Sequence, residues 1–215
     1  MGGQFLYHCG CNLSRFWLKL FYRYKVIGPH YCLLRGAIIA SNHCSFIDPL
    51  AIGAAWPDPV HFLARSTLFK PAWWGRLLLA VNARPIEREG SDLGAFRTAC
   101  QLIEKGARVI IFPEGTRSRS QEMGEIKAGA ALIATKTRCP IVPIYLHGFH
   151  EIWGRQRKLP RFRGRAICVV GSPIEWHEFA HLDRKEAQKA ITQRLTNALK
   201  ALQDWYRQGA VGLPP

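Results

Sequence analysis

A His and an Asp separated by four residues are the most informative chemical feature of this chain. His43 and Asp48 lie in residues 41–49 (SNHCSFIDP), directly after the apolar run 36–40. Five residues of regular helix would rotate the two side chains about 140° apart, so they can meet only where a loop turns into a helix. There Asp48 would accept the imidazole N–H and stabilise the imidazolium while the other nitrogen takes a proton. The spacing therefore indicates a general base with an orienting acid.

A second polar segment follows another apolar run. Residues 112–118 (FPEGTRS) lie about seventy positions beyond the first segment. We interpret the two segments as parts of one active site. No Ser is obviously placed as a nucleophile, which suggests that the substrate's own hydroxyl is the nucleophile.

Four other interpretations of the first segment stay open. Cys44 or Ser45 could form a covalent intermediate, although adjacent loop residues seldom point at each other as nucleophile and base must. Ser45 could instead cap the helix expected to begin near Phe46. A metal site at His43, Cys44 and Asp48 would lack the usual Cys-x-x-Cys or His-x-x-x-His partners. Finally, His43 could have only a structural role, as a hydrogen-bonding partner for polar groups of a buried turn.

Four blocks of this chain resemble, in order, the signatures of the glycerolipid acyltransferases, above all the lysophosphatidate acyltransferases. They are residues 42–48 (NHCSFID), 83–88 (ARPIER), 112–118 (FPEGTRS) and 139–144 (CPIVPI). The second block is the loosest match, because Asn82, Ala83 and Arg84 replace a small or apolar run and Glu87 stands where Asp is common. The match covers about residues 35–150.

The resemblance implies transfer of a fatty acyl group from a thioester to the sn-2 hydroxyl of lysophosphatidic acid, which gives phosphatidic acid in phospholipid synthesis. It implies that His43 is the base, that Asp48 orients it, and that the substrate-binding residues are Arg88, Glu114, Gly115, Thr116 and Arg117. A phosphate suits Arg side chains and backbone N–H groups, and a Gly lets the backbone come close. Glu114, beside an anionic ligand, should hold an Arg, bind the glycerol hydroxyl or serve a structural role.

The implied reaction needs no metal or redox cofactor. Its co-substrate would be acyl-CoA or an acyl carrier protein, and the thioester oxygen would need N–H donors near the helix start after His43 or in the Gly115 loop. A related acyltransferase acting on glycerol 3-phosphate or another lysophospholipid is the nearer alternative. A basic nucleic-acid-binding module is the farther one. No recognition motif supports it, and the basic residues are dispersed.

Composition fits a single basic domain. The chain has 215 residues, of which 48% are hydrophobic, enough for one full core. Thirty Lys and Arg against 15 Asp and Glu give a formal charge of +15, which predicts anionic partners such as phospholipid headgroups, coenzyme A or an acidic carrier protein. The seven Cys are odd in number and scattered, which favours reduced thiols and a cytosolic setting.

The sequence predicts attachment to a membrane surface. No apolar run is long enough for a conventional spanning helix. Residues 12–25 carry large apolar side chains at helical spacing with Arg and Lys among them, which is typical of an interfacial helix, although a core-packing helix has the same pattern. Residues 73–79 form a second candidate. We therefore expect a peripheral, monotopic protein on the cytoplasmic face of a membrane with anionic lipids.

Alternating elements predict an α/β single domain with a mixed or largely parallel sheet flanked by helices. The expected strands are 36–41, 59–64, 83–87, 107–112, 140–146 and 165–170, and the expected helices after the first are 46–55, 71–81, 92–105, 127–136 and 183–207. The chain divides into a membrane-associating segment (1–30), an acyltransferase domain (31–208) and a disordered tail (209–215). The basic stretch 155–165 is expected to be a mobile loop or hairpin that could dock headgroups or carrier protein.

Overall fold

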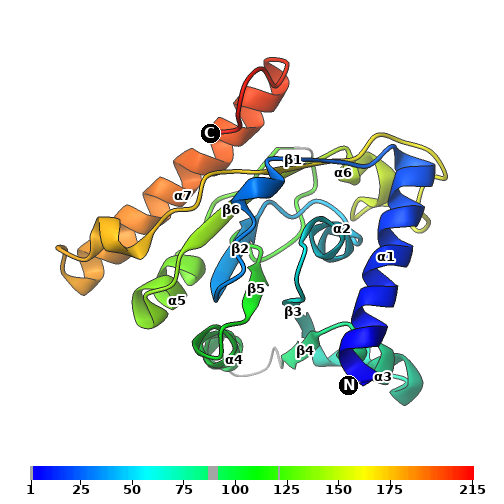
Figure 1. Ribbon diagram of the computed structural model, residues 1–215, viewed down its shortest axis with the longest axis horizontal. Helices are drawn as coiled ribbons and strands as arrows, with labels where there is room; N and C mark the ends of the chain where they lie inside the picture. Colours follow the sequence, from blue (N-terminus) through cyan, green and yellow to red (C-terminus); the bar gives the residue numbers. More distant parts are fainter. Residues whose placement is uncertain (1, 87–91, 121) are drawn as a thin grey trace.

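A seven-stranded sheet with the strand order β1-β7-β6-β2-β5-β3-β4 organises the computed structural model, which describes residues 2–86, 92–120 and 122–215 (Figure 1). All neighbouring strands are parallel except β6 and β7, which are antiparallel. The predicted mixed, largely parallel sheet is thereby confirmed. The strands are β1 (Lys25–Ile27), β2 (Ala37–Ser41), β3 (Val60–Arg65), β4 (Ala83–Ile86), β5 (Arg108–Ile111), β6 (Ile141–His147) and β7 (Ile167–Val170).

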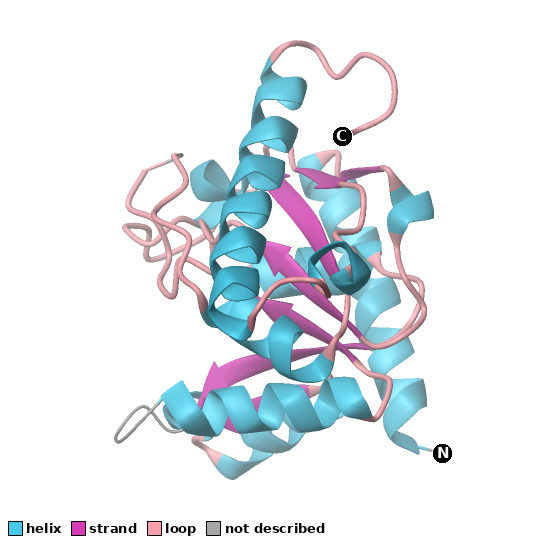
Figure 2. Cartoon of the chain, turned by 90° about the vertical axis from the view of Figure 1, so that its left-hand side faces the viewer, coloured by secondary structure: helices cyan, strands magenta, loops and turns pink. Residues whose placement is uncertain are grey.

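Helices cover both faces of this sheet, as Figures 1 and 2 show. One face packs against α4, α5 and α7, and the other packs against α1, α2 and α6. Successive strand residues point to opposite faces. Ile38 therefore packs in the core beneath α4, α5 and α7, and Ile39 packs in the core beneath α1, α2 and α6. The helices are α1 (Gly2–Tyr22), α2 (Asp48–Ala55), α3 (Ala72–Ala80), α4 (Asp92–Glu104), α5 (Gly129–Thr137), α6 (Phe149–Trp153) and α7 (Arg184–Arg207), with short 3₁₀ turns η1 (Pro29–Tyr31), η2 (Ser66–Phe69) and η3 (Trp176–Phe179).

The N-terminal helix differs in its limits from the one that the sequence predicts. It begins at Gly2 rather than near residue 12 and ends at Tyr22, because Arg23 adopts a left-handed conformation with φ 47°. The chain then enters β1, an edge strand that the sequence does not predict.

Helix α1 is both a packing helix and an exposed apolar surface. Leu18 and Tyr22 are fully buried against the core, whereas Leu13, Phe16 and Leu20 are 69%, 64% and 62% exposed. Within the described residues, no helix is long and apolar enough to cross a membrane. One side of α1 therefore packs on the core, and the other side presents apolar side chains at the surface.

The C-terminal residues 209–215, for which the sequence predicts disorder, lie against the domain. Pro214 is buried, and the carbonyl oxygen of Pro215 accepts a hydrogen bond of 3.0 Å from the Ser172 N–H. The Trp205 indole N–H donates to the carbonyl of Val211 at 2.9 Å. Apolar contact and these backbone hydrogen bonds give the segment a fixed position that its Gly- and Pro-rich sequence does not reveal.

Candidate active site

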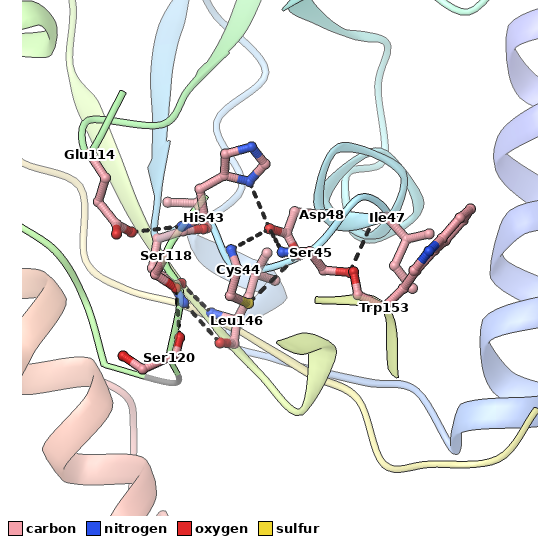
Figure 3. Close-up of polar contacts among 12 residues, drawn as sticks. His43, Cys44, Ser45, Ile47, Asp48, Glu114, Ser118, Ser120, Leu146 and Trp153 are labelled. Atoms are coloured by element: carbon pink, nitrogen blue, oxygen red, sulfur yellow. Dashed lines mark hydrogen bonds and ion pairs between the residues drawn. The ribbon is translucent and has the colours of Figure 1, made fainter. Parts of the chain in front are cut away.

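The loop after β2 brings His43 and Asp48 into direct contact. His43 lies two residues beyond the end of β2, and Asp48 is the first residue of α2. The His43 Nδ1 is 2.8 Å from Asp48 Oδ2 (Figure 3). The change from strand to loop to helix supplies the bend that five residues of uniform helix would not allow.

Three N–H groups converge on one oxygen of Asp48. Besides the imidazole, the backbone N–H groups of Cys44 and Ser45 each donate to Oδ2 at 2.7 Å, and the Asp48 side chain is fully buried. An ionised carboxylate only accepts hydrogen bonds, so the proton of a neutral His43 belongs on Nδ1. This assignment leaves the lone pair on Nε2, the nitrogen that faces away from Asp48. The first turn of α2 also favours a negative charge at Asp48.

The second polar segment lies against the first at His43. The Phe112 ring stacks on the imidazole with centroids 3.9 Å apart and an interplanar angle of 17°. The Ser118 N–H donates to the His43 carbonyl at 2.8 Å. The side chain of His43 is 19% exposed, so its ring is fixed but still open to solvent. The two segments thus form one site.

Both carboxylate oxygens of Glu114 accept hydrogen bonds from backbone N–H groups. Its Oε1 accepts the His43 N–H at 2.8 Å and its Oε2 accepts the Gly124 N–H at 2.8 Å. Burial raises the pKa of Glu114, while these two N–H donors oppose the increase. The contacts correspond to the structural role among the three that the sequence left open for this residue.

Arg117 has an unusual environment for a guanidinium. Its central carbon lies 3.5 Å from the centroid of the Phe46 ring, in a cation–π arrangement. Burial lowers the pKa of Arg117, and the positive charges of Arg155 and Arg65 lower it further, whereas Asp48 opposes them. The Arg117 Nη1 is buried and has no hydrogen-bond partner among the described residues. An anion beside Arg117 would supply both a partner and a compensating charge.

The other expected substrate-binding residues are less enclosed. Gly115 has a left-handed φ of 70°, and a Cβ placed there would come within 3.3 Å of the Lys127 Nζ. Both Gly115 and Thr116 are exposed. Arg88 lies outside the described residues.

The structure weighs against the alternative nucleophiles. Burial, followed by the nearby Asp48 charge, raises the pKa of the Cys44 thiol well above its usual value, which disfavours the reactive thiolate. The Ser45 hydroxyl is buried and donates to the Trp153 carbonyl at 2.9 Å. Ser45, for which the sequence left a capping role open, is not the N-cap of α2; that residue is Ile47, whose N–H donates to the Ser45 hydroxyl at 3.4 Å.

Several expected oxyanion donors already have protein acceptors. The N–H groups of Cys44 and Ser45 donate to Asp48, and that of Gly115 donates to the Phe112 carbonyl at 3.0 Å. We therefore remove these three groups from the candidates for stabilising a thioester oxygen. Within the described part of the chain, no cluster of three or more His, Cys, Asp or Glu side chains could hold a metal ion.

The sequence did not predict the hydrogen bonds of Asn42 and Trp153, which hold the loop after β2 in place. Asn42 acts as a clamp, because its side chain donates to the Leu146 carbonyl at 3.0 Å and accepts the Leu146 N–H at 2.7 Å. Trp153 accepts hydrogen bonds from the Ser45 hydroxyl and from the Phe46 N–H. A polar Asn directly after a buried strand was the available signal for the clamp, whereas nothing local in the sequence pairs Trp153 with residues 45 and 46.

Comparisons with known proteins point to one family. The acyltransferase family model matches residues 23–147. A 1-acyl-sn-glycerol-3-phosphate acyltransferase of Bacillus subtilis is 31% identical over 170 residues, covering 79% of this chain and 82% of the relative. A chloroplastic 1-acyl-sn-glycerol-3-phosphate acyltransferase of Brassica napus is 34% identical over 163 residues, but the match covers 74% of this chain and only 46% of that relative.

A solved structure shares the fold. The crystal structure of the 1-acyl-sn-glycerophosphate acyltransferase PlsC from Thermotoga maritima matches with a TM-score of 0.71 and 23% identity, covering 90% of this chain and 79% of that chain. Nothing in the comparisons supports the nucleic-acid-binding alternative. The resemblance seen in the four sequence blocks is confirmed, and this chain belongs to the acyltransferase family.

Proposed function

We propose that this protein transfers a fatty acyl group from an acyl thioester to the sn-2 hydroxyl of lysophosphatidic acid, forming phosphatidic acid. The observation that carries the proposal is the His43–Asp48 pair lying in one site with Arg117, whose buried Nη1 has no hydrogen-bond partner among the described residues. The names of the Bacillus and Brassica relatives support the choice of acceptor. A base and an anion-binding group together suit a substrate that carries both a hydroxyl and a phosphate.

In the proposed reaction, His43 handles the proton at Nε2 while Asp48 holds Nδ1–H. Nε2 removes the hydroxyl proton as the hydroxyl oxygen attacks the thioester carbon. The C–S bond then breaks, and the imidazolium returns the proton to the leaving thiolate. Because the acceptor oxygen attacks directly, the reaction needs no acyl-enzyme. The buried and hydrogen-bonded state of Cys44 and Ser45 supports this direct route.

We assign the acceptor phosphate to Arg117, with Gly115 and Thr116 as the exposed backbone beside it. The left-handed Gly115 permits close approach of a ligand to the loop. Arg88 remains a proposed second contact on the ground of the sequence block alone. We assign Glu114 the task of holding the backbone of His43 rather than touching the acceptor, because both of its oxygens already accept N–H groups.

We propose that the protein works as a peripheral enzyme at the cytoplasmic face of a membrane, with acyl-CoA or acyl carrier protein as donor. The exposed apolar side of α1 would lie among the lipids, and the net charge of +15 would favour anionic headgroups. Seven free thiols suit a reducing compartment.

A panel assay tests the proposed reaction. Purified protein is incubated with either donor and with lysophosphatidic acid, glycerol 3-phosphate or other lysophospholipids, and the products are identified by mass. We expect the wild type to form phosphatidic acid and a folded His43→Ala variant to form none that can be detected. General base catalysis contributes about 10²–10⁴-fold or more to the rate. Preferred acylation of another acceptor would replace the assigned substrate, and activity of His43→Ala near the wild-type level would remove His43 as the base.

A further inference from the structure

The loop between α6 and β7 combines a high positive charge with two strongly exposed apolar side chains. Residues 155–165 (RQRKLPRFRGR) contain six Arg or Lys and no Asp or Glu. Within this loop Leu159 is 76% exposed and Phe162 is 82% exposed. Single exposed apolar residues are ordinary on protein surfaces, but two of them within a wholly basic segment match the composition of membrane-surface elements.

The backbone of this loop is fixed even though its side chains are exposed. The Arg161 N–H donates to the Ile152 carbonyl at 2.9 Å, and the Tyr22 hydroxyl donates to the Arg161 carbonyl at 2.7 Å. Near the other end, the Gly164 N–H donates to the Phe21 carbonyl at 3.3 Å. The loop, which the sequence predicts to be mobile, therefore holds Leu159 and Phe162 outward from an anchored position.

The loop lies beside the C-terminal end of α1, as Figure 1 shows for its yellow segment at the upper right. The exposed Phe16 and Leu20 belong to the last two turns of this helix. The apolar surface of α1 and the apolar tips of the loop thus belong to neighbouring elements.

We propose that residues 155–165 form a second membrane contact, in which Leu159 and Phe162 enter the headgroup region and the surrounding Arg and Lys bind anionic lipids. The positive charge of residues 155–165 complements anionic headgroups. Burial of Leu159 and Phe162 among lipid chains would remove their apolar surfaces from water. An acidic carrier protein would satisfy the charges alone. The lipid surface satisfies the charges and the tips together, and it continues the contact proposed for α1.

This contact would bring the lipid surface to the catalytic loop. The residue before the loop, Gly154, forms an antiparallel bridge with Ser45, and the adjacent Trp153 carbonyl accepts hydrogen bonds from Ser45 and Phe46. Arg155, at the start of the loop, is close enough to lower the pKa of Arg117. Docking of the loop would therefore place the entrance of the acceptor site at the headgroup level. This consequence rests on the proposed function, whereas the lipid contact itself does not.

The test measures binding of the full chain to vesicles by sedimentation. A charge variant combines Arg157→Gln, Lys158→Gln and Arg163→Gln, leaving Arg155 intact because it lies near the acceptor site. Each Lys or Arg near an anionic surface strengthens binding about fivefold, so the loss of three charges should weaken binding to phosphatidylglycerol-containing vesicles by about a hundredfold. Its binding to pure phosphatidylcholine vesicles should change little. The matched control removes three exposed charges from α7, as Lys189→Gln, Arg194→Gln and Lys200→Gln, and should bind as the wild type does.

An apolar variant combines Leu159→Ser with Phe162→Ser. It should lower binding to both kinds of vesicle by about tenfold, since partial burial of two large side chains is lost. The matched control changes Val211→Ser and Leu213→Ser, which are 83% and 72% exposed at the C-terminus. All four side chains are exposed, so the melting temperatures should stay near that of the wild type. If the double variant is unstable, vesicle binding is measured with the single variant Phe162→Ser instead.

Wild-type vesicle binding by both loop variants would overturn the proposal. If those variants instead showed a higher KM only for a carrier-protein donor, the loop would be a protein-docking surface and not a lipid contact. The sedimentation results do not depend on turnover. Activity on detergent-dispersed lysophosphatidic acid therefore tests the proposed reaction separately, and an inactive wild type that still needs the loop for vesicle binding would refute only the reaction.

Discussion

Replacing Asp48 with Asn separates the charge of the His43–Asp48 pair from its geometry. Oδ2 of Asp48 receives N–H groups from His43, Cys44 and Ser45. An Asn side chain has one acceptor oxygen, and three donors at one position require that oxygen to face them. Its amide nitrogen would then occupy the position of Oδ1, near the Cys44 sulfur. The variant should therefore keep the loop conformation and the proton on Nδ1.

What Asp48→Asn removes is the attraction between a carboxylate and the imidazolium that forms during the reaction. Two unit charges about 4 Å apart interact by about 4 kcal/mol at an effective dielectric constant of about 20. Because His43 remains 19% exposed, solvent screening reduces the loss, and we expect about 3–4 kcal/mol. That energy corresponds to a decrease in kcat of about 10²–10³-fold. The decrease should be smaller than the ~10⁴-fold loss that follows when an Asn imposes the wrong tautomer on a catalytic His.

The assay compares kcat at saturating donor and acceptor, with the melting temperature measured on the same preparations. Asp204→Asn, an exposed position on α7, is the matched control and should leave kcat unchanged. An Asp48→Asn enzyme with kcat within a few-fold of the wild type would refute the role of Asp48 in stabilising the imidazolium. A loss of about 10⁴-fold in a folded variant would refute the amide orientation argued above.

Four further outcomes are expected. Cys44→Ala should keep kcat within a few-fold of wild type, because the thiol is buried and protonated; a folded but inactive variant would support a covalent route. Arg117→Ala should raise the acceptor KM by about tenfold or more with little change in donor KM, and Arg117→Lys should recover only part of the affinity; a selective rise in donor KM would move Arg117 to the donor site. Phe16→Ser with Leu20→Ser should weaken vesicle sedimentation at unchanged melting temperature, and unaltered sedimentation would leave α1 a packing helix only. Burial lowers the pKa of His61 from 6.5 to about 4, so the unfolded chain binds more protons in this window and the unfolding free energy should fall as pH drops from 6.5 to 4. His61→Gln should reduce that dependence, by at most about 2 kcal/mol given the partial exposure, and an unchanged urea-unfolding profile would contradict the assignment.

The regular elements were predictable because their patterns are local. Apolar β-branched runs mark β2, β5 and β6, and Asp183 with Glu186 forms the capping box that begins α7. The edge strand β1 was not predictable, since its three residues are ordered by pairing with β7, more than a hundred positions away in the sequence. The contact of Pro215 with Ser172 was missed for the same reason, because the two residues lie more than forty positions apart in the sequence.

The contact between His43 and Asp48 was predictable from residue types, but its surroundings were not. The spacing of His43 and Asp48, together with the FPEGTRS block, indicated one site before any geometry was known. The stacking of Phe112 on His43 and the clamp of Asn42 on Leu146 depend on how distant strands align. A sequence states which side chains are available, whereas the partner of a polar side chain in this site is often a backbone group that carries no sequence signal.

Glu114 illustrates how this limit affects functional reasoning. A carboxylate beside a phosphate site looks unfavourable, which is why the sequence left three roles open. Both oxygens of Glu114 accept N–H groups, one from His43 and one from Gly124, which favours the structural role. The Ser118 N–H donates to the carbonyl of the same His43, so the second polar segment holds both backbone groups of this residue. The second segment is thus held against His43 by hydrogen bonds to both of its backbone groups, so in the proposed reaction the two segments present a base and a cation to one substrate.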